Sequence, residues 1–113
     1  MATECLFCKI AAGDIPAELI FEDDQVVAFR DISPQAPVHF LIIPRKHLAG
    51  PAEIVEENEA LAGHMIRVAG VVAKKEGIDD FRLVFNNGAE AGQTVFHIHL
   101  HVLGGRAMTW PPG

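Results

Sequence analysis

Three histidines at every second position are the residues of this chain best suited to chemistry. His97, His99 and His101 alternate with Ile98 and Leu100. A period of two is a β-strand pattern, so the three imidazoles share one face of a strand. At about 3.3 Å per residue, His97 and His101 lie roughly 13 Å apart, too far to hold one atom together. Such a row offers an acid, a base, a nucleophile or a metal ligand near neutral pH, with His99 in the middle.

The structural alternative is a half-buried strand whose polar face happens to be histidine. Three histidines beside a loop of small and amide residues, 86–94, favour chemistry instead. Gly92, Gln93 and Thr94 can offer N–H groups, an amide and a hydroxyl to phosphate oxygens. A neutral imidazole facing them can attack phosphorus, while a neighbouring histidine protonates the leaving group. The chain has no Walker loop and no G-x-G-x-x-G, which excludes an ordinary kinase or dinucleotide site.

A C-x-x-C pair, Cys5 and Cys8, opens the chain. It has three interpretations: a redox couple, half of a metal site, or two small buried residues. The redox interpretation is the weakest, because no βαβ pattern surrounds the pair. With His47 and His97 the two thiolates would complete a tetrahedral Cys₂His₂ zinc site, provided that the fold brings all four together.

Composition limits the classes of protein that this chain can be. Its 113 residues, half of them hydrophobic, fit a single domain over 1–113. A net charge of −6 argues against non-specific binding to nucleic acid. From residue 81 onward the charged residues are Arg82, Glu90 and Arg106, which suits an anionic ligand near the histidines. We expect a cytoplasmic protein without a membrane span or structural disulfide, because no secretory signal or long apolar run is visible.

The sequence pattern predicts an α+β domain on a mostly antiparallel sheet. A short helix over residues 5–12 ends at Gly13, and a long helix covers residues 51–77. The predicted strands are residues 17–21, 25–30, 38–43 and 81–85, followed by the histidine strand. His39 lies at the start of the third strand, and by itself it reads as structural.

The histidine strand also carries a family resemblance. Residues 97–103 fit the H-φ-H-φ-H-φ-φ signature of the histidine triad (HIT) family, and the match extends along nearly the whole chain. Residues 31–37, 39–44, 104–106 and 110–113 all look like the Hint branch of that family.

The resemblance implies a HIT-like fold, with one five-stranded antiparallel sheet per chain and the sheets of two chains joined in a homodimer. It implies a purine nucleoside phosphoramidase that releases an amine and AMP or GMP. His99 would be the nucleophile, and His101 would bind phosphate and assist proton transfer in a relay with His39. Asp31 matches a carboxylate that holds the ribose hydroxyls, although a carboxylate opening a loop is usually a turn-former.

The remaining implied site residues fall into groups by the part of the ligand that they contact. The apolar base pocket would consist of Leu6, Phe7, Ile10, Phe29 and Ile32. The phosphate side would consist of Asn86, Gly92, Gln93, Thr94 and Val95. Trp110 matches a residue that reaches toward the partner subunit's site. Some members bind zinc through residues matching Cys5, Cys8, His47 and His97, while others lack the cysteines and fold without metal.

Three other functions remain open at the level of sequence. One is a dinucleoside polyphosphate hydrolase of the same superfamily, although the Trp-Pro-Pro-Gly ending favours the phosphoramidase. Another is a nucleotide-binding module with a regulatory or scaffold role. The third is a small zinc protein.

Overall fold

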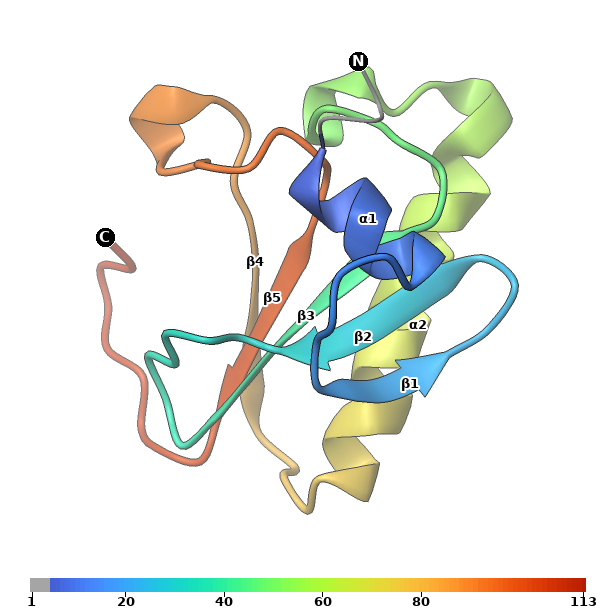
Figure 1. Cartoon of the computed structure of the whole chain (residues 1–113). Helices are drawn as coiled ribbons and strands as arrows, with labels where there is room; N and C mark the ends of the chain where they lie inside the picture. The colour runs from blue at the N-terminus through green and yellow to red at the C-terminus, as the bar shows by residue number, and fades with distance from the viewer. Residues whose placement is uncertain (1–4) are drawn as a thin grey trace.

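One antiparallel sheet forms the centre of the computed structural model, which describes residues 5–113. Its strand order is β1-β2-β3-β5-β4, and every neighbouring pair is antiparallel (Figure 1). The strands are β1 (Leu19–Glu22), β2 (Val26–Arg30), β3 (Val38–Pro44), β4 (Phe81–Phe85) and β5 (Leu100–Gly104). The predicted α+β class and five-stranded antiparallel sheet are confirmed.

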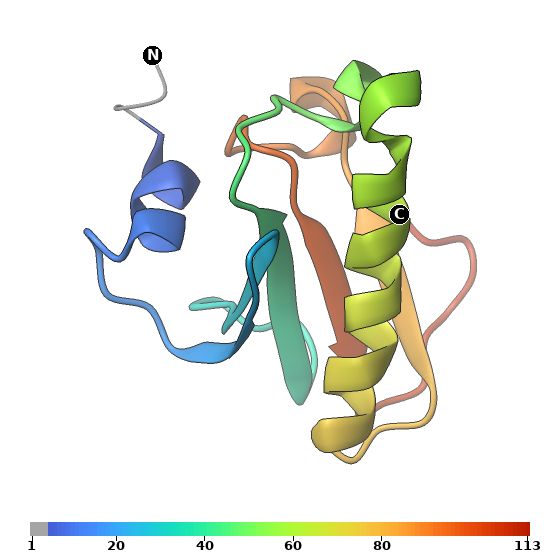
Figure 2. The ribbon, with the colours of Figure 1, turned by 90° about the vertical axis from the view of Figure 1, so that its right-hand side faces the viewer.

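The two helices lie on opposite faces of the sheet (Figure 2). The short helix α1 (Leu6–Ala12) ends at Gly13, whose φ of 82° is left-handed, as the sequence predicted. The long helix α2 (Glu59–Lys75) covers the other face, where Leu100 and Val102 join the larger apolar cluster. Because side chains alternate along a strand, the histidines of this segment face α1. No helix within residues 5–113 has the length and apolar character needed to span a membrane.

The long helix begins eight residues later than the sequence pattern indicated. Two 3₁₀ turns, η2 (Pro51–Glu53) and η3 (Glu56–Asn58), precede α2 and are separated by extended backbone at Ile54 and Val55. The prediction of one helix over 51–77 was therefore wrong in its first part. Polar groups of this segment bond to neighbouring loops instead, because Glu53 Oε1 accepts the Ala49 N–H at 2.7 Å and the Ala52 N–H donates to Asn87 Oδ1 at 2.8 Å.

The histidine segment enters the sheet only at its end. β5 starts at Leu100, so His97, which lies in a bend, and His99 both precede the ladder. There the Ile98 N–H donates to the Leu48 carbonyl at 2.7 Å. Phe96, the residue before the first histidine of the row, is 51% exposed, whereas His97 is fully buried. With helices on both faces, the histidine side of the segment is part of the interior rather than a solvated face.

Candidate active site and metal centre

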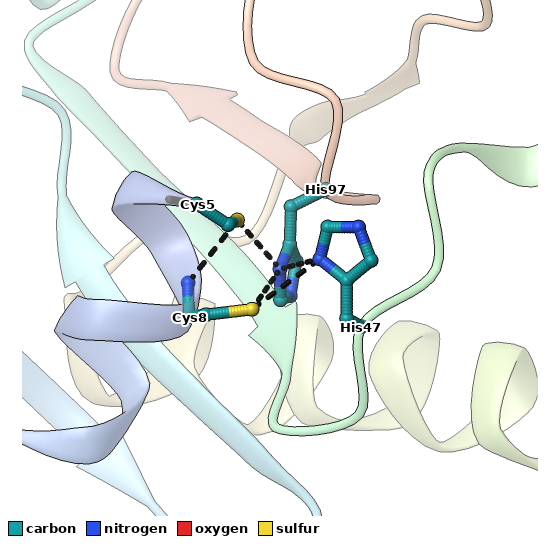
Figure 3. A group of neighbouring side chains, drawn as sticks. All are labelled: Cys5, Cys8, His47 and His97. Carbon is teal, nitrogen blue, oxygen red and sulfur yellow. Dashed lines mark hydrogen bonds between the residues drawn. The ribbon is translucent and has the colours of Figure 1, made fainter. Parts of the chain in front are cut away.

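Two cysteines and two histidines from three separate segments meet beside α1 (Figure 3). Cys5 caps the N-terminus of α1 by accepting the Cys8 N–H at 3.3 Å, which fixes the first turn. His47 comes from the loop after β3, and His97 from the segment before β5. Their donor atoms all lie within 4.8 Å of one another. The four residues that the sequence suggested as metal ligands are therefore close enough to hold one ion.

The geometry of this cluster fits a tetrahedral metal ion. His97 Nδ1 lies 3.3 Å from Cys5 Sγ, 3.4 Å from Cys8 Sγ and 3.1 Å from His47 Nδ1. Bond lengths of about 2.0–2.3 Å to zinc give a tetrahedron with edges of about 3.3–3.8 Å. The second nitrogen of His97 donates to the Pro44 carbonyl at 2.8 Å, so the lone pair of Nδ1 is directed into the cluster. Burial raises the pKa of the Cys8 thiol to about 11, so a bound metal must displace that proton.

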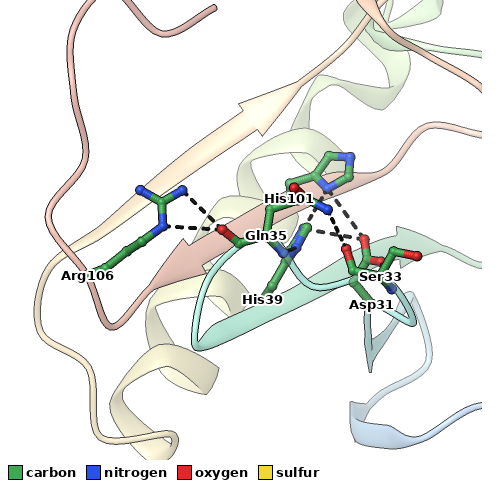
Figure 4. A network of polar contacts seen from close by, with 6 residues as sticks. All are labelled: Asp31, Ser33, Gln35, His39, His101 and Arg106. Carbon is green, nitrogen blue, oxygen red and sulfur yellow. Dashed lines mark hydrogen bonds and ion pairs between the residues drawn. The ribbon is translucent and has the colours of Figure 1, made fainter.

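A second cluster, formed by Asp31, His39 and His101, is a hydrogen-bonded relay rather than a metal cage (Figure 4). The Gln35 N–H donates to His39 Nδ1 at 3.0 Å. The proton of neutral His39 is therefore on Nε2, which donates to His101 Nδ1 at 2.9 Å. His39 Nδ1 already uses its lone pair to accept the Gln35 N–H. To bind a metal ion as well, Nε2 would need a lone pair of its own, and neutral imidazole has a lone pair on only one nitrogen. Asp31 Oδ2 lies 3.4 Å from His39 Nε2 and 4.0 Å from His101 Nδ1.

Burial keeps both histidines of this relay uncharged at neutral pH. It lowers the pKa of His101 from 6.5 to about 4, helped by repulsion from His99 and His39 and opposed by Asp31. It also lowers the pKa of His39, again against the attraction of Asp31. Neutral His101 accepts at Nδ1, so its proton is on Nε2, where it can donate to an anionic ligand.

His99 is held in the opposite tautomer. Its Nδ1 donates to the His97 carbonyl at 2.8 Å, which leaves the lone pair on Nε2. The ring of Phe7 packs edge-on against it at a centroid distance of 5.1 Å, and the His101 ring lies at 5.0 Å. His99 is 7% exposed. The middle histidine thus has a fixed orientation and an unprotonated nitrogen, as a nucleophile requires.

A cavity of about 580 Å³ connects these groups, since both His99 and His101 line it. Apolar side chains from α1 and β2, including Phe7, Ile10 and Phe29, line one part of it. Its polar part includes Asp31, Asn86, Thr94 and the two histidines. A larger cavity of about 750 Å³ lies between residues 78–82 and 105–108, but no histidine or cysteine lines it. The smaller cavity is therefore the candidate active site.

Comparison with known proteins identifies the family. Residues 12–108 match the HIT domain. The chain belongs to the HIT family. This HIT domain is 54% identical over 114 residues to an uncharacterized HIT-like protein of Synechocystis sp., with both chains fully covered. It superimposes on the crystal structure of a HIT family hydrolase from Legionella pneumophila Philadelphia 1 with a TM-score of 0.95 and 53% identity, covering 97% of this chain and 100% of that one. A histidine triad protein from Clostridium difficile gives a TM-score of 0.91 and 40% identity, covering 94% of each chain.

Most residues that the resemblance assigned to nucleotide binding line the smaller cavity of this HIT domain. They are Leu6, Phe7, Ile10, Phe29, Asp31, Ile32, Asn86, Gly92, Thr94, Val95, His99 and His101. His39 and His97 do not line the cavity, but each contacts a histidine that does. His39 Nε2 donates to His101 Nδ1, and the His97 carbonyl accepts from His99 Nδ1.

Two of the assigned residues lie elsewhere. The Gln93 side chain is 3% exposed and bonds to backbone, accepting the Gly88 N–H and donating to the Ala49 and Val95 carbonyls. Trp110 is 81% exposed and lies beside Arg82, away from the cavity of its own chain. The backbone N–H groups of Gly92 and Gln93, expected to face phosphate, donate within their own loop. Thr94 and Asn86 are therefore the polar loop side chains at the cavity.

Sequence reasoning missed three polar residues of this HIT domain that are linked to the site. Glu18 and Arg30 line the cavity and form an ion pair at 2.9 Å. The pairing of β1 with β2 places them together, which the predicted hairpin could have indicated. Gln35 carried no signal, because its contribution is a backbone N–H that any residue but proline supplies.

Proposed function

We propose that this HIT protein hydrolyses the P–N bond of purine nucleoside 5′-phosphoramidates through a nucleotidyl-His99 intermediate. The observation that carries the proposal is the unprotonated Nε2 of His99, held at a cavity beside the Nε2–H of His101. A nucleophile and a hydrogen-bond donor on adjacent positions of one face suit a phosphoryl group bound between them. Two solved relatives are HIT family hydrolases, which supports the same class of reaction.

The cavity matches a nucleoside monophosphate in three parts. The apolar side chains of Phe7 and Phe29 offer flat surfaces for a purine, and their rings are 5.5 Å apart. Asp31 can accept hydrogen bonds from ribose hydroxyls through Oδ2, because its Oδ1 already accepts the Ser33 N–H at 2.7 Å. Thr94 and Asn86 would contact the phosphate oxygens.

The reaction proceeds in two displacements at phosphorus. His99 Nε2 attacks, the P–N bond breaks, and the amine leaves after taking a proton from water. His101 Nε2–H donates to a phosphoryl oxygen and stabilises the charge that develops there. Water then attacks phosphorus, the bond to His99 breaks, and a proton returns to solvent with release of the nucleoside monophosphate. His97 contributes its carbonyl, which keeps the His99 proton on Nδ1 in both steps.

We also propose that Cys5, Cys8, His47 and His97 hold a structural zinc ion. Zinc supplies a rigid link between segments here, and the chemistry at phosphorus does not require it. The ligand set ties α1 to the His97 segment, so it would keep the apolar wall of the cavity in place.

Substrate comparison and intermediate trapping test the proposal. The wild-type protein should cleave an adenosine phosphoramidate faster than a diadenosine polyphosphate, and the reverse order would favour the polyphosphate hydrolase. Rapid acid-free quenching and peptide mass spectrometry should locate the nucleotide on His99. His99→Ala should abolish turnover and keep nucleotide binding. Unchanged turnover in that variant, or a nucleotide on another residue, would exclude the proposed nucleophile.

A further inference from the structure

A line of hydrogen bonds runs from the C-terminal segment to the cavity (Figure 4). Arg106 donates to the Gln35 carbonyl through Nε at 3.2 Å and Nη2 at 3.1 Å. The N–H of the same Gln35 donates to His39 Nδ1, and His39 Nε2 donates to His101 Nδ1. Arg106 lies outside the cavity and is exposed, so it cannot touch a ligand bound there.

The Gln35 N–H fixes which group donates and which accepts in these hydrogen bonds. A backbone N–H can only donate, so Gln35 forces His39 to accept at Nδ1 and to carry its proton on Nε2. His101 must then accept at Nδ1, and its proton is on Nε2. If the Gln35 N–H moved away, either nitrogen of His39 could carry the proton, and His101 would lose its fixed partner.

The position of Gln35 depends on contacts with the turn after β5. Gly105, at φ 90°, lies against the loop of residues 31–37 that contains Gln35. A Cβ added to Gly105 would be 2.9 Å from Pro37 Cβ. Arg106 holds the loop from the same turn by its two bonds to one carbonyl. Its remaining Nη1 donates to the Ala107 carbonyl at 3.1 Å, which orients the guanidinium. Hydrogen bonds from a charged donor are about twice as strong as neutral ones.

We infer that Arg106 is a positioning residue that sets the tautomers of His39 and His101 by holding the backbone of Gln35, whose carbonyl it binds and whose N–H His39 accepts. The tautomers are a property of the fold, while the consequence for turnover rests on the proposed phosphoramidase function. The two parts are therefore tested separately.

Nitrogen-15 NMR of the imidazole rings tests the tautomers without any substrate. In the wild-type protein, Nε2 of His39 and His101 should be protonated and Nδ1 should not. In Arg106→Met both nitrogens of His39 should shift toward the average of two tautomers, and Arg106→Lys, which keeps one donor, should shift less in the same direction. Arg67→Met removes a charge from the exposed side of α2 and should match the wild type. Wild-type tautomers in either Arg106 variant would overturn the inference.

Kinetics test whether the effect passes through His39. We expect Arg106→Met to lower kcat on an adenosine phosphoramidate about tenfold and to change KM by less than about twofold, because a donor is misdirected but binding surfaces remain. In a His39→Gln background the same substitution should have no further effect. An undiminished tenfold loss in that background would show that Arg106 acts by another route. A wild-type protein without phosphoramidase activity would instead contradict the proposed function, and the NMR result would still decide the tautomers.

Discussion

At the scale of residues, backbone groups assign a different task to each histidine of the triad. His97 donates to the Pro44 carbonyl and His99 donates to the His97 carbonyl, so opposite nitrogens are left free. His101 accepts from His39 and carries its proton on the nitrogen that remains. The alternating pattern predicted a shared face but could not predict the tautomers of His97 and His101, because their partners, Pro44 and His39, lie on chain segments far away in sequence.

The partly buried position of His101 predicts that acid destabilises the protein through this residue. Its pKa in the folded chain is about 4, against 6.5 unfolded, so the unfolded state binds more protons between these values. The stability that His101 contributes is complete above pH 6.5 and is lost as the pH falls toward 4. His99, His39 and Asp31 are the titratable groups facing it.

Urea unfolding at pH 7 and pH 5 measures this contribution. His101→Asn keeps an oxygen that can accept the hydrogen bond from His39. Between pH 7 and pH 5 its free energy of unfolding should fall by about 2 kcal/mol less than that of the wild type. Equal losses in the two proteins would mean that His101 is not shifted in the folded state.

At the scale of elements, α1 has two tasks that the sequence assigned separately. Its first turn carries Cys5 and Cys8, and its inward face places Phe7 and Ile10 against the cavity. A helix of seven residues is too short to be stable alone, so tertiary contacts must hold it. The proposed metal centre and the apolar pocket therefore depend on the same short helix.

Removal of the proposed zinc ion should loosen this helix and weaken nucleotide binding. We expect a chelator to lower Tm by about 5 °C or more, which corresponds to at least about 1 kcal/mol in a domain of this size. KM should rise more than kcat falls, because the pocket wall moves while His99 keeps its carbonyl partner. Thermal unfolding and steady-state kinetics check this, with Cys8→Ser as a control that should not respond to the chelator. An absence of bound metal together with an unchanged Tm would contradict the zinc proposal.

The sequence predicted most helices and strands. Its predictions failed where side chains form hydrogen bonds with backbone groups of nearby loops or turns. The first four strands lie within two residues of their predicted bounds, because apolar alternation reports burial on the sheet, and β4 has the predicted bounds of Phe81–Phe85. The strand predicted to carry all three histidines starts only at Leu100 and includes His101 alone. The start of α2 was misplaced because acidic residues favour a helix N-terminus, whereas Asn58 Oδ1 here accepts the Val55 N–H and stabilises a separate turn. Gln93 was predicted as a phosphate ligand because its side chain is polar. In the structure its amide forms hydrogen bonds with backbone groups of Gly88 and Ala49 instead. Patterns along the chain report burial, while such local pairings depend on the fold.

At the scale of the whole molecule, the two edges of the sheet differ. β1 has four residues, an irregular register between Leu19 and Phe21, and a glutamate at its end, all of which discourage pairing with another strand. β4 is regular, and Arg82 is its one charged residue. An edge of this kind favours joining to a second copy, which agrees with the homodimer that the resemblance implies.

Sedimentation should therefore show a dimer joined along β4, with twice the chain mass of 12.3 kDa. Val84→Glu would bring two carboxylates close together where the β4 strands of two chains meet, so we expect it to shift the protein toward the monomer. Leu19→Glu adds the same charge to the opposite edge and should leave the dimer intact. If Leu19→Glu dissociated the dimer and Val84→Glu did not, β1 would be the shared edge.

Trp110 is exposed and does not line the cavity of its own chain, and the resemblance implies that it reaches toward the site of the partner subunit. In the dimer we therefore expect Trp110→Ala to weaken nucleotide binding. In a monomeric Val84→Glu protein, Trp110→Ala should leave nucleotide binding unchanged.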